Sequence, residues 1–381
     1  MERSIAQGGV SGRAPDPFDV AIARRTDDAD IRRLLRECAT DGWIRLSLER
    51  EPDALAAAAV MGPHHHYIVA RAKRSGQTIG LCEWSARETF IDGEVRLLPY
   101  LGALRIAASD RHRIRILRQG FEAVRRLPRP RGATPYALTA IGAENPAALR
   151  LLGRNLSGMP TYRRVEPFAT FALRPAHARH SIDVERAGVN DLAAIAVCLE
   201  RTYRQFQYAP VWHASDLADP QRCPGLRPED FLIVRRGPGI AACVALWDQR
   251  AFKQTVVRGY PGWLERLRPA INVAAPLLRM PLLPAVGQRL CQIYLSHLAV
   301  EGNDEDLFRC IVTAALSEAR RRGFVLALLG LSPRHPLAAA LRRSWRHREY
   351  RALLHLVHWA DGAAAVARIA PSIPHVEIAV L

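Results

Sequence analysis

Lysine is almost absent from this 381-residue chain. It occurs only at Lys73 and Lys253, so arginine supplies the other 52 of the 54 basic residues. The preference for arginine over lysine can reflect the coding composition of the genome, but the formal net charge of +17 needs another explanation. A positive field favours anionic partners, which include a phosphorylated cofactor, RNA, an acidic protein and an anionic membrane surface.

Paired cysteines are missing as well. The seven cysteines are scattered, and no two of them stand in a CxxC spacing. This distribution argues against a disulfide framework or a cysteine zinc site, and it predicts reduced, buried thiols in a cytoplasmic protein. The adjacent histidines 64–66 have no Cys, Asp or Glu at a ligand spacing, so no metal site is expected.

The chain also has no long uninterrupted apolar run. Residues 1–17 lack the apolar core of a signal peptide, and we expect them to form a disordered arm. Residues 255–290 are apolar, but five prolines and Arg279 interrupt them. A membrane span needs about 20 unbroken apolar residues, so no transmembrane segment is expected. A serine nucleophile elbow, a Walker loop and a dinucleotide fingerprint are absent too.

What the sequence does contain is an internal repeat. Residues 18–25 alternate as a strand does, and a helix with one apolar face follows at 31–38. The same pair returns as a strand at 182–187 and an amphipathic helix at 192–199. A length of 381 residues exceeds one ordinary core, so two domains are expected.

The far ends of the two halves match in the same way. Each has an apolar strand, at 136–143 and 324–331, followed by a helix with proline in its first turn. Each then has a Tyr-Arg pair, which begins at Tyr162 or Tyr350, ahead of a last strand. The second half is longer in its middle, and residues 255–290 account for the difference.

These matches predict the domain boundaries. We expect an α/β domain at 18–173, a polar linker at 174–181, a second α/β domain at 182–360 and a tail at 361–381. The extra residues of the second half are expected to form an inserted pair of short helices. These helices would pack over the second sheet or at the domain interface.

The order of elements within each half resembles the GNAT superfamily of N-acyltransferases. Three strands and a long helix follow the first helical segment in both halves, at 65–73, 77–86, 94–109 and 111–127 and again at 230–237, 240–250, 290–300 and 304–323. The resemblance implies two GNAT-like domains, each with a mixed, mainly antiparallel central sheet flanked by helices. It also implies transfer of an acyl group from acetyl-CoA or a longer acyl-CoA to the amine of a small molecule or peptide.

In GNAT proteins acyl-CoA lies between the fourth and fifth strands. The pantetheine arm pairs with exposed backbone, which corresponds here to Leu104 and Ile106. The pyrophosphate rests on the start of the next helix, where free N–H groups and the helix dipole attract anions. In this chain that turn carries Arg111, Arg113 and Arg115 but has isoleucine at both glycine positions of the family motif. The arginines suggest a phosphate site, whereas the alternative is a solvated face of an arginine-rich protein.

The second half has a different turn at this place. Asp304, Glu305 and Asp306 stand where a pyrophosphate would lie, and they can satisfy the helix N-terminus themselves. The first half is therefore expected to hold the cofactor. Asn145 stands where the family has an amide that contacts CoA, although a helix cap would explain it equally well.

The resemblance also suggests catalytic side chains. Tyr162 and Tyr350 are candidates to protonate the departing thiolate. Glu83 and His297 are candidates to deprotonate the amine, since burial and neighbouring charges can tune such groups toward neutral pH. Half-buried structural residues would give the same pattern.

Two other functions remain open. The first is an aminoacyl-tRNA-dependent transferase of related tandem fold, for which the positive charge would be the footprint. The second is a degenerate GNAT pair that serves as a binding or assembly module. The acceptor, the acyl chain length and the oligomeric state stay open in each case.

Overall fold

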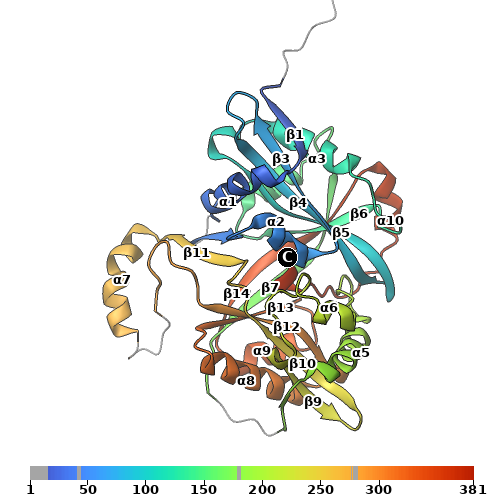
Figure 1. Ribbon diagram of the computed structural model, residues 1–381, viewed down its shortest axis with the longest axis vertical. Helices are drawn as coiled ribbons and strands as arrows, with labels where there is room; N and C mark the ends of the chain where they lie inside the picture. Colours follow the sequence, from blue (N-terminus) through green and yellow to red (C-terminus); the bar gives the residue numbers. More distant parts are fainter. Residues whose placement is uncertain (1–15, 41–43, 178–181, 276, 278–281) are drawn as a thin grey trace, which may run out of the picture.

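The computed structural model describes residues 16–40, 44–177, 182–275, 277 and 282–381, and the statements below concern these residues. Most of the expected N-terminal arm and half of the expected linker lie outside them. The described chain builds one 12-stranded sheet (Figure 1). Its strands, from one edge to the other, are β1 (Phe18–Ile22), β3 (His64–Ala72), β4 (Thr78–Ile91), β5 (Glu94–Ile106), β6 (Tyr136–Gly142), β14 (His347–His358), β7 (Thr161–Leu173), β13 (Leu326–Leu331), β12 (Gln292–Val300), β10 (Gly239–Trp247), β9 (Phe231–Arg236) and β8 (Glu185–Arg186).

The two halves repeat the same strand order from each edge inward and exchange their last strands at the centre. β7, from the first half, pairs with β13 of the second half, and β14 pairs with β6 of the first. β7 and β14 also pair with each other. The named strands of this sheet pair antiparallel except for β5 with β6 and β12 with β13. The expected α/β class, with a mainly antiparallel sheet flanked by helices, is therefore confirmed.

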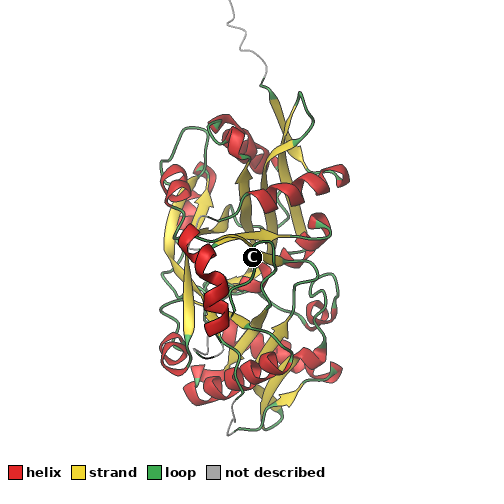
Figure 2. Ribbon diagram, turned by 90° about the vertical axis from the view of Figure 1, so that its left-hand side faces the viewer, coloured by secondary structure: helices red, strands yellow, loops and turns green. Residues whose placement is uncertain are grey.

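Helices cover both faces of the sheet in each half (Figure 2). They are α1 (Asp28–Glu37), α2 (Ala54–Ala57), α3 (Ile114–Arg126), α4 (Pro146–Leu152), α5 (Leu192–Tyr203), α6 (Ala214–Ala218), α7 (Gly262–Ala274), α8 (Glu305–Arg321), α9 (Ala338–Ser344) and α10 (Ala363–Ala367). The apolar residues of β10 show why a strand covered on both faces has no polar alternation. Ala242, Val244 and Leu246 share a core with α8, whereas the alternate Cys243 and Ala245 share one with α5.

The insertion in the second half differs from its prediction. An inserted pair of helices was wrong, because its first part is a strand, β11 (Gln254–Gly259), and one helix, α7, follows. β11 pairs antiparallel with β2 (Arg45–Glu49) of the first half, which the sequence analysis did not anticipate. The prolines of the insertion do not interrupt this strand, because they all lie after β11. Residues 276 and 278–281 lie outside the described residues.

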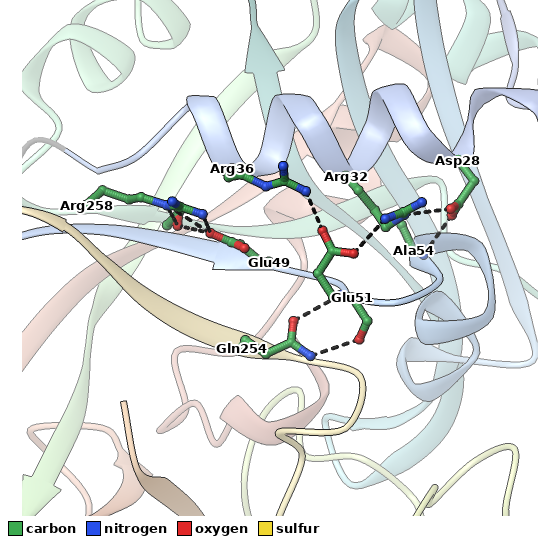
Figure 3. A network of polar contacts seen from close by, with 9 residues as sticks. Asp28, Arg32, Arg36, Glu49, Glu51, Ala54, Gln254 and Arg258 are labelled. Carbon is green, nitrogen blue, oxygen red and sulfur yellow. Dashed lines mark hydrogen bonds and ion pairs between the residues drawn. The ribbon is translucent and has the colours of Figure 1, made fainter. Parts of the chain in front are cut away.

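The β11–β2 pair joins the two halves, and the interface between them was one of the two locations expected for the insertion. Side chains of α1 and of the loop after β2 tie it together (Figure 3). Glu51 accepts from Arg32 at 2.6 Å and from Arg36 at 2.7 Å, and the Gln254 amide exchanges two hydrogen bonds with its main chain. α7 packs on this small sheet through Leu264 and projects away from the main one (Figure 1).

The expected tail returns to the centre of the molecule (Figure 1). His375 donates its main-chain N–H to Gln207, and Gln207 donates its own to Ile373. The buried ammonium of Lys253 donates to the main-chain oxygens of Ala379 and Leu381, at 3.2 and 2.7 Å. The last residues of the sequence are therefore part of the core of the second half.

Candidate functional site

In the first half β5 and β6 diverge. Their parallel pairing is limited to Tyr100 opposite Leu138, with the Thr139 hydroxyl donating to the carbonyl of Leu101 just beyond it. From Gly102 to Ile106, β5 pairs only with β4. The β6-facing side of this part of β5 is therefore left without a strand partner in the described chain.

A β-bulge marks the point of divergence. The β4–β5 register shifts between Leu81 and Glu83, and Ala103 within the bulge has a φ of 47°. Bulges turn main-chain groups out of the regular ladder, which is a common device beside binding sites. Gly102 leaves room here, since a Cβ added to it would lie 2.9 Å from Cε1 of Tyr100.

The second half repeats this geometry residue for residue. β12 pairs with β13 from Gln292 to Tyr294 and then diverges. Its bulge residue is His297, with a φ of 52°, three residues after Tyr294 as Ala103 is three residues after Tyr100. The internal repeat therefore extends to the bulge and the split between the strands.

The two splits differ in what occupies them. In the second half Glu377 accepts from the main-chain N–H of His297 on β12 at 2.9 Å. The next residue, Ile378, packs on Gly330 of β13 so closely that a Cβ there would lie 2.6 Å from it. This segment closes the second split. Among the described residues, no carboxylate accepts from the main-chain N–H of Ala103, the counterpart of His297.

The helix starts beside the two splits differ in the same sense. Asp304 caps α8 by accepting from the N–H groups of Asp306 and Leu307, at 2.9 and 3.0 Å, as the sequence predicted. α3 has no capping side chain and no acid in its first turn. Arginines lie there instead, so the positive end of the helix dipole has no built-in compensation.

The three predicted phosphate-binding arginines lie at this start of α3. Arg113 pairs with the buried Asp110 at 3.1 Å, and Arg115 pairs with Asp16 at 2.9 Å nearer the surface. Arg111 is exposed and has no ion pair within the described residues. The exposed Arg115–Asp16 pair is of a kind that contributes little to stability.

A small apolar pocket lies between α3 and the strands β1, β3, β4 and β5 of the first half. Its lining includes the predicted Leu104 and Ile106 from β5 and Leu117, Gly120 and Phe121 from α3. Tyr162, on β7, packs edge-on to Phe121 with ring centres 6.3 Å apart. Burial raises the pKa of the Tyr162 hydroxyl, which keeps it protonated. The structure therefore brings these three predicted residues to one side of the sheet.

Glu83 lies beside the bulge on the other face of β4. It is directly opposite Gly102 in the ladder, and its carboxylate lies 3.7 Å from the Arg50 guanidinium. Burial raises the pKa of the Glu83 carboxyl, and the Arg50 charge offsets part of this rise. The Glu83 carboxyl is therefore more easily protonated than an exposed one.

The structure does not bring the other predicted residues to this place. His297 lies in the closed split, where burial lowers its pKa to about 3, so its imidazole is neutral and weakly basic. Tyr350 is exposed in the middle of β14. Asn145 caps α4 by accepting from the N–H of Ala148 at 3.0 Å, so the helix-cap alternative holds for its side chain. Its proposed contact with CoA stays a prediction.

Sequence reasoning missed several buried charged residues at the junction of the halves. These are Arg50, Arg87, Lys253 and Glu377. Lys253 carried a signal, because it is one of only two lysines in an arginine-rich chain. Nothing local in the sequence distinguishes Arg50 or Arg87 from the many surface arginines.

Comparison with known proteins supports the fold but provides no sequence family. No family model and no curated protein matches the chain. The structure is similar to Saccharomyces cerevisiae N-myristoyltransferase with bound myristoyl-CoA, with 10% identity and a TM-score of 0.57 over 91% of this chain and 83% of that one. It is also similar to a GCN5-related N-acetyltransferase from Sphaerobacter thermophilus, with 14% identity and a TM-score of 0.54 over 90% and 96%.

The chain has a tandem GNAT fold. A fungal glucosamine N-acetyltransferase region has a TM-score of 0.58 at 12% identity, and this match covers 90% of the chain and 38% of the larger fungal protein. No described helix of the chain has the length and apolar character needed to cross a membrane.

Proposed function

We propose that the protein is an N-acyltransferase that transfers an acyl group from acyl-CoA to an amine, and that the first half holds the acyl-CoA. The carrying observation is the contrast between the two equivalent splits. The second is closed by Glu377 and Ile378 and has an acid-capped helix, whereas the first has an arginine-rich, uncapped helix start. Acyl-CoA is also the ligand bound in the similar N-myristoyltransferase structure.

Binding follows from the residues around the first split. The pantetheine arm would pair with the unpartnered backbone of β5 at Leu104 and Ile106, and the apolar pocket would take the apolar part of the ligand. The phosphates would lie at the start of α3, where Arg111, Arg113 and Arg115 add charge to the helix dipole. Isoleucine in place of glycine keeps the backbone farther from phosphate, so affinity should be modest and sensitive to salt.

The chemistry follows from Glu83, Ala103 and Tyr162. Glu83 takes the proton of the acceptor ammonium, and the free amine attacks the thioester carbonyl carbon. The main-chain N–H at the Ala103 bulge stabilises the negative oxygen of the tetrahedral intermediate. The nitrogen of the intermediate loses its extra proton to water as the C–S bond breaks. Tyr162 protonates the leaving thiolate and regains a proton from water.

The test uses the full chain, because the exchanged strands β7 and β14 join the two halves. Calorimetry with acetyl-CoA should show one site per chain. Replacing Arg111 and Arg113 by alanine should weaken binding at least tenfold and reduce its salt dependence. The matched control is Arg125→Ala with Arg126→Ala, which removes the same charge from the far end of α3.

Two results would overturn the assignment. One is equal loss of affinity in both double variants, which would reveal a general charge effect. The other is total RNA binding to a chain that does not bind acyl-CoA, which would favour the aminoacyl-tRNA alternative.

A further inference from the structure

β4 carries a row of buried polar side chains that begins at Glu83. Glu83, Ser85 and Arg87 are only 1%, 1% and 8% exposed. Their neighbours Trp84 and Ala86 pack in the core beneath α3. Because side chains alternate along a strand, the three polar residues share the opposite face. The register with β5 is regular from Glu83 to Arg87, so this row is straight.

The guanidinium of Arg87 has no acceptor in the described chain. Its Nε, Nη1 and Nη2 atoms are all buried without a hydrogen-bond partner. Burial lowers the pKa of Arg87 to about 9. Arginines nearer the surface are paired, as Arg32 and Arg36 are with Glu51 (Figure 3). A buried cation with all its donors unpaired is costly, and native proteins keep such groups where a ligand completes them.

The second half supplies the other wall of this place. The Arg87 guanidinium lies 4.6 Å from the ring centre of Trp212, whose indole Nε1 is also buried without a partner. The ring of His297 is 4.3 Å from Trp212, and its Nε2 is unpartnered too. The Arg87 guanidinium and the Trp212 indole N–H therefore bring donors from both halves together, and an anion is the ligand that satisfies them.

The nearby carboxylates are already committed to other groups. Glu377 accepts from the main-chain N–H groups of His297 and Ala379, and Asp216 pairs with Arg222 at 3.5 Å. Their charges also oppose a second negative charge at the site. One planar guanidinium in this setting matches a monoanion with two oxygens, which is a carboxylate rather than a phosphate dianion.

We propose that Arg87 binds the carboxylate of the acceptor, so that the acceptor is an amine that carries a carboxylate several bonds away. The assignment rests on the proposed function, with Glu83 facing the amine. Four strand residues span about 13 Å between the Cα atoms of Glu83 and Arg87. The two charges of an α-amino acid are too close together for this spacing. An ω-amino acid or the carboxyl end of a short peptide fits it.

The experiment measures acetyl transfer from acetyl-CoA to matched pairs of acceptors. One member of each pair has a free carboxylate and the other has the corresponding amide, with glycine, 6-aminohexanoate and triglycine as the series. In the wild type, the carboxylate form of 6-aminohexanoate or triglycine should have a kcat/KM at least tenfold above its amide, and glycine should show no such preference. Arg87→Met should bring the ratio to about one, mainly through KM. Arg204→Met, which removes an exposed arginine stacked on Phe90, should leave it unchanged.

Thermal unfolding separates ligand binding from a structural role. Triglycine should raise the melting temperature of the wild type and not that of Arg87→Met, and the unliganded variant should be at least as stable as the wild type. Three results would overturn the assignment. They are an Arg87→Met variant less stable than the wild type, an equal effect of chloride on the melting temperatures of both proteins, and equal carboxylate-to-amide ratios of kcat/KM in both proteins. If no amine is acetylated and acetyl-CoA does not bind, it is the proposed function that fails.

Discussion

The main-chain N–H of His297 and the carboxylate of Glu377 form a buried hydrogen bond of 2.9 Å that closes the second split. Its counterpart in the first half is the Ala103 bulge, whose φ is similar and for which the described residues offer no equivalent of Glu377. The same arrangement of diverging strands thus appears twice, and Glu377 and Ile378 close the second of them. The difference arises from residues far apart in the sequence, which the repeat itself does not encode.

Removing the acceptor from this closed split should destabilise the protein. Glu377→Ala leaves the N–H groups of His297 and Ala379 buried without a partner, at a cost of about 1–3 kcal/mol for each. Glu377→Gln keeps an oxygen for His297 and should lose less. Urea unfolding of the two variants measures the difference. Equal stability of both variants would show that this hydrogen bond does not hold the segment in place.

Buried histidines should make the fold less stable as the pH falls. Burial lowers the pKa of His335 from 6.5 to about 4, so the unfolded chain binds a proton in this window and the folded chain does not. The contribution of His335 to the free energy of unfolding is therefore complete above pH 6.5. It is lost as the pH falls toward 4, by up to about 1.4 kcal/mol per pH unit. Burial lowers the pKa of His297 and His375 to about 3, which acts in the same direction.

A substitution isolates the contribution of His335. Its Nδ1 accepts from the main-chain N–H of Leu337 at 3.1 Å, and an asparagine oxygen can take that place. We expect His335→Asn to be less stable than the wild type at pH 6.5. The difference in their free energies of unfolding should shrink as the pH falls from 6.5 to 4. Chemical denaturation at pH 7 and pH 5 measures the gap. A gap that is constant with pH would contradict the assigned pKa shift.

The small pocket between α3 and the sheet offers a matched pair of substitutions at Gly120. A Cβ there meets no atom within 4 Å, so Gly120→Ala should stabilise α3 by about 0.5–1 kcal/mol and leave acyl-CoA affinity unchanged. Gly120→Leu extends into the pocket and should weaken acyl-CoA binding at least tenfold. Calorimetry measures the acyl-CoA affinity of both variants. Equal affinities would show that acyl-CoA does not enter this pocket.

The sequence predicted the repeated core because its physical signals are local. The strand at Phe18–Ile22, the helix that contains Ile31 and Leu34, and the Asp304 cap each follow from spacing or from a single side chain. The exchange of β7 and β14 could not be predicted in this way. Both strands have the same local pattern whichever half they join, and only pairing across the whole chain decides it.

The candidate site also contains residues that the local sequence could indicate and others that only the folded chain reveals. Glu83 and the arginines at the start of α3 could be found from their place in the repeat. The insertion was misread because β11 needs β2 as a partner, and that partner comes about 200 residues earlier. Arg87 was missed since only the packing of Trp212 and the lack of any acceptor make it unusual.

Glu83 provides the sharpest test of the chemistry. If Glu83 is the general base, Glu83→Gln should lower kcat by at least about 100-fold with little change in acyl-CoA affinity.

The pH dependence of the reaction tests the same residue. Because burial raises the pKa of Glu83 above the ordinary 4.5, kcat/KM should fall on the acid side at a pH above that value. Arg50 favours the ionised carboxylate, so Arg50→Met should raise the pKa of Glu83 further and move the acid limb to higher pH. Arg36→Met, which removes an exposed guanidinium paired with Glu51, should leave the limb in place. A pH profile that is the same in both arginine variants, or full activity of Glu83→Gln, would exclude Glu83 as the base.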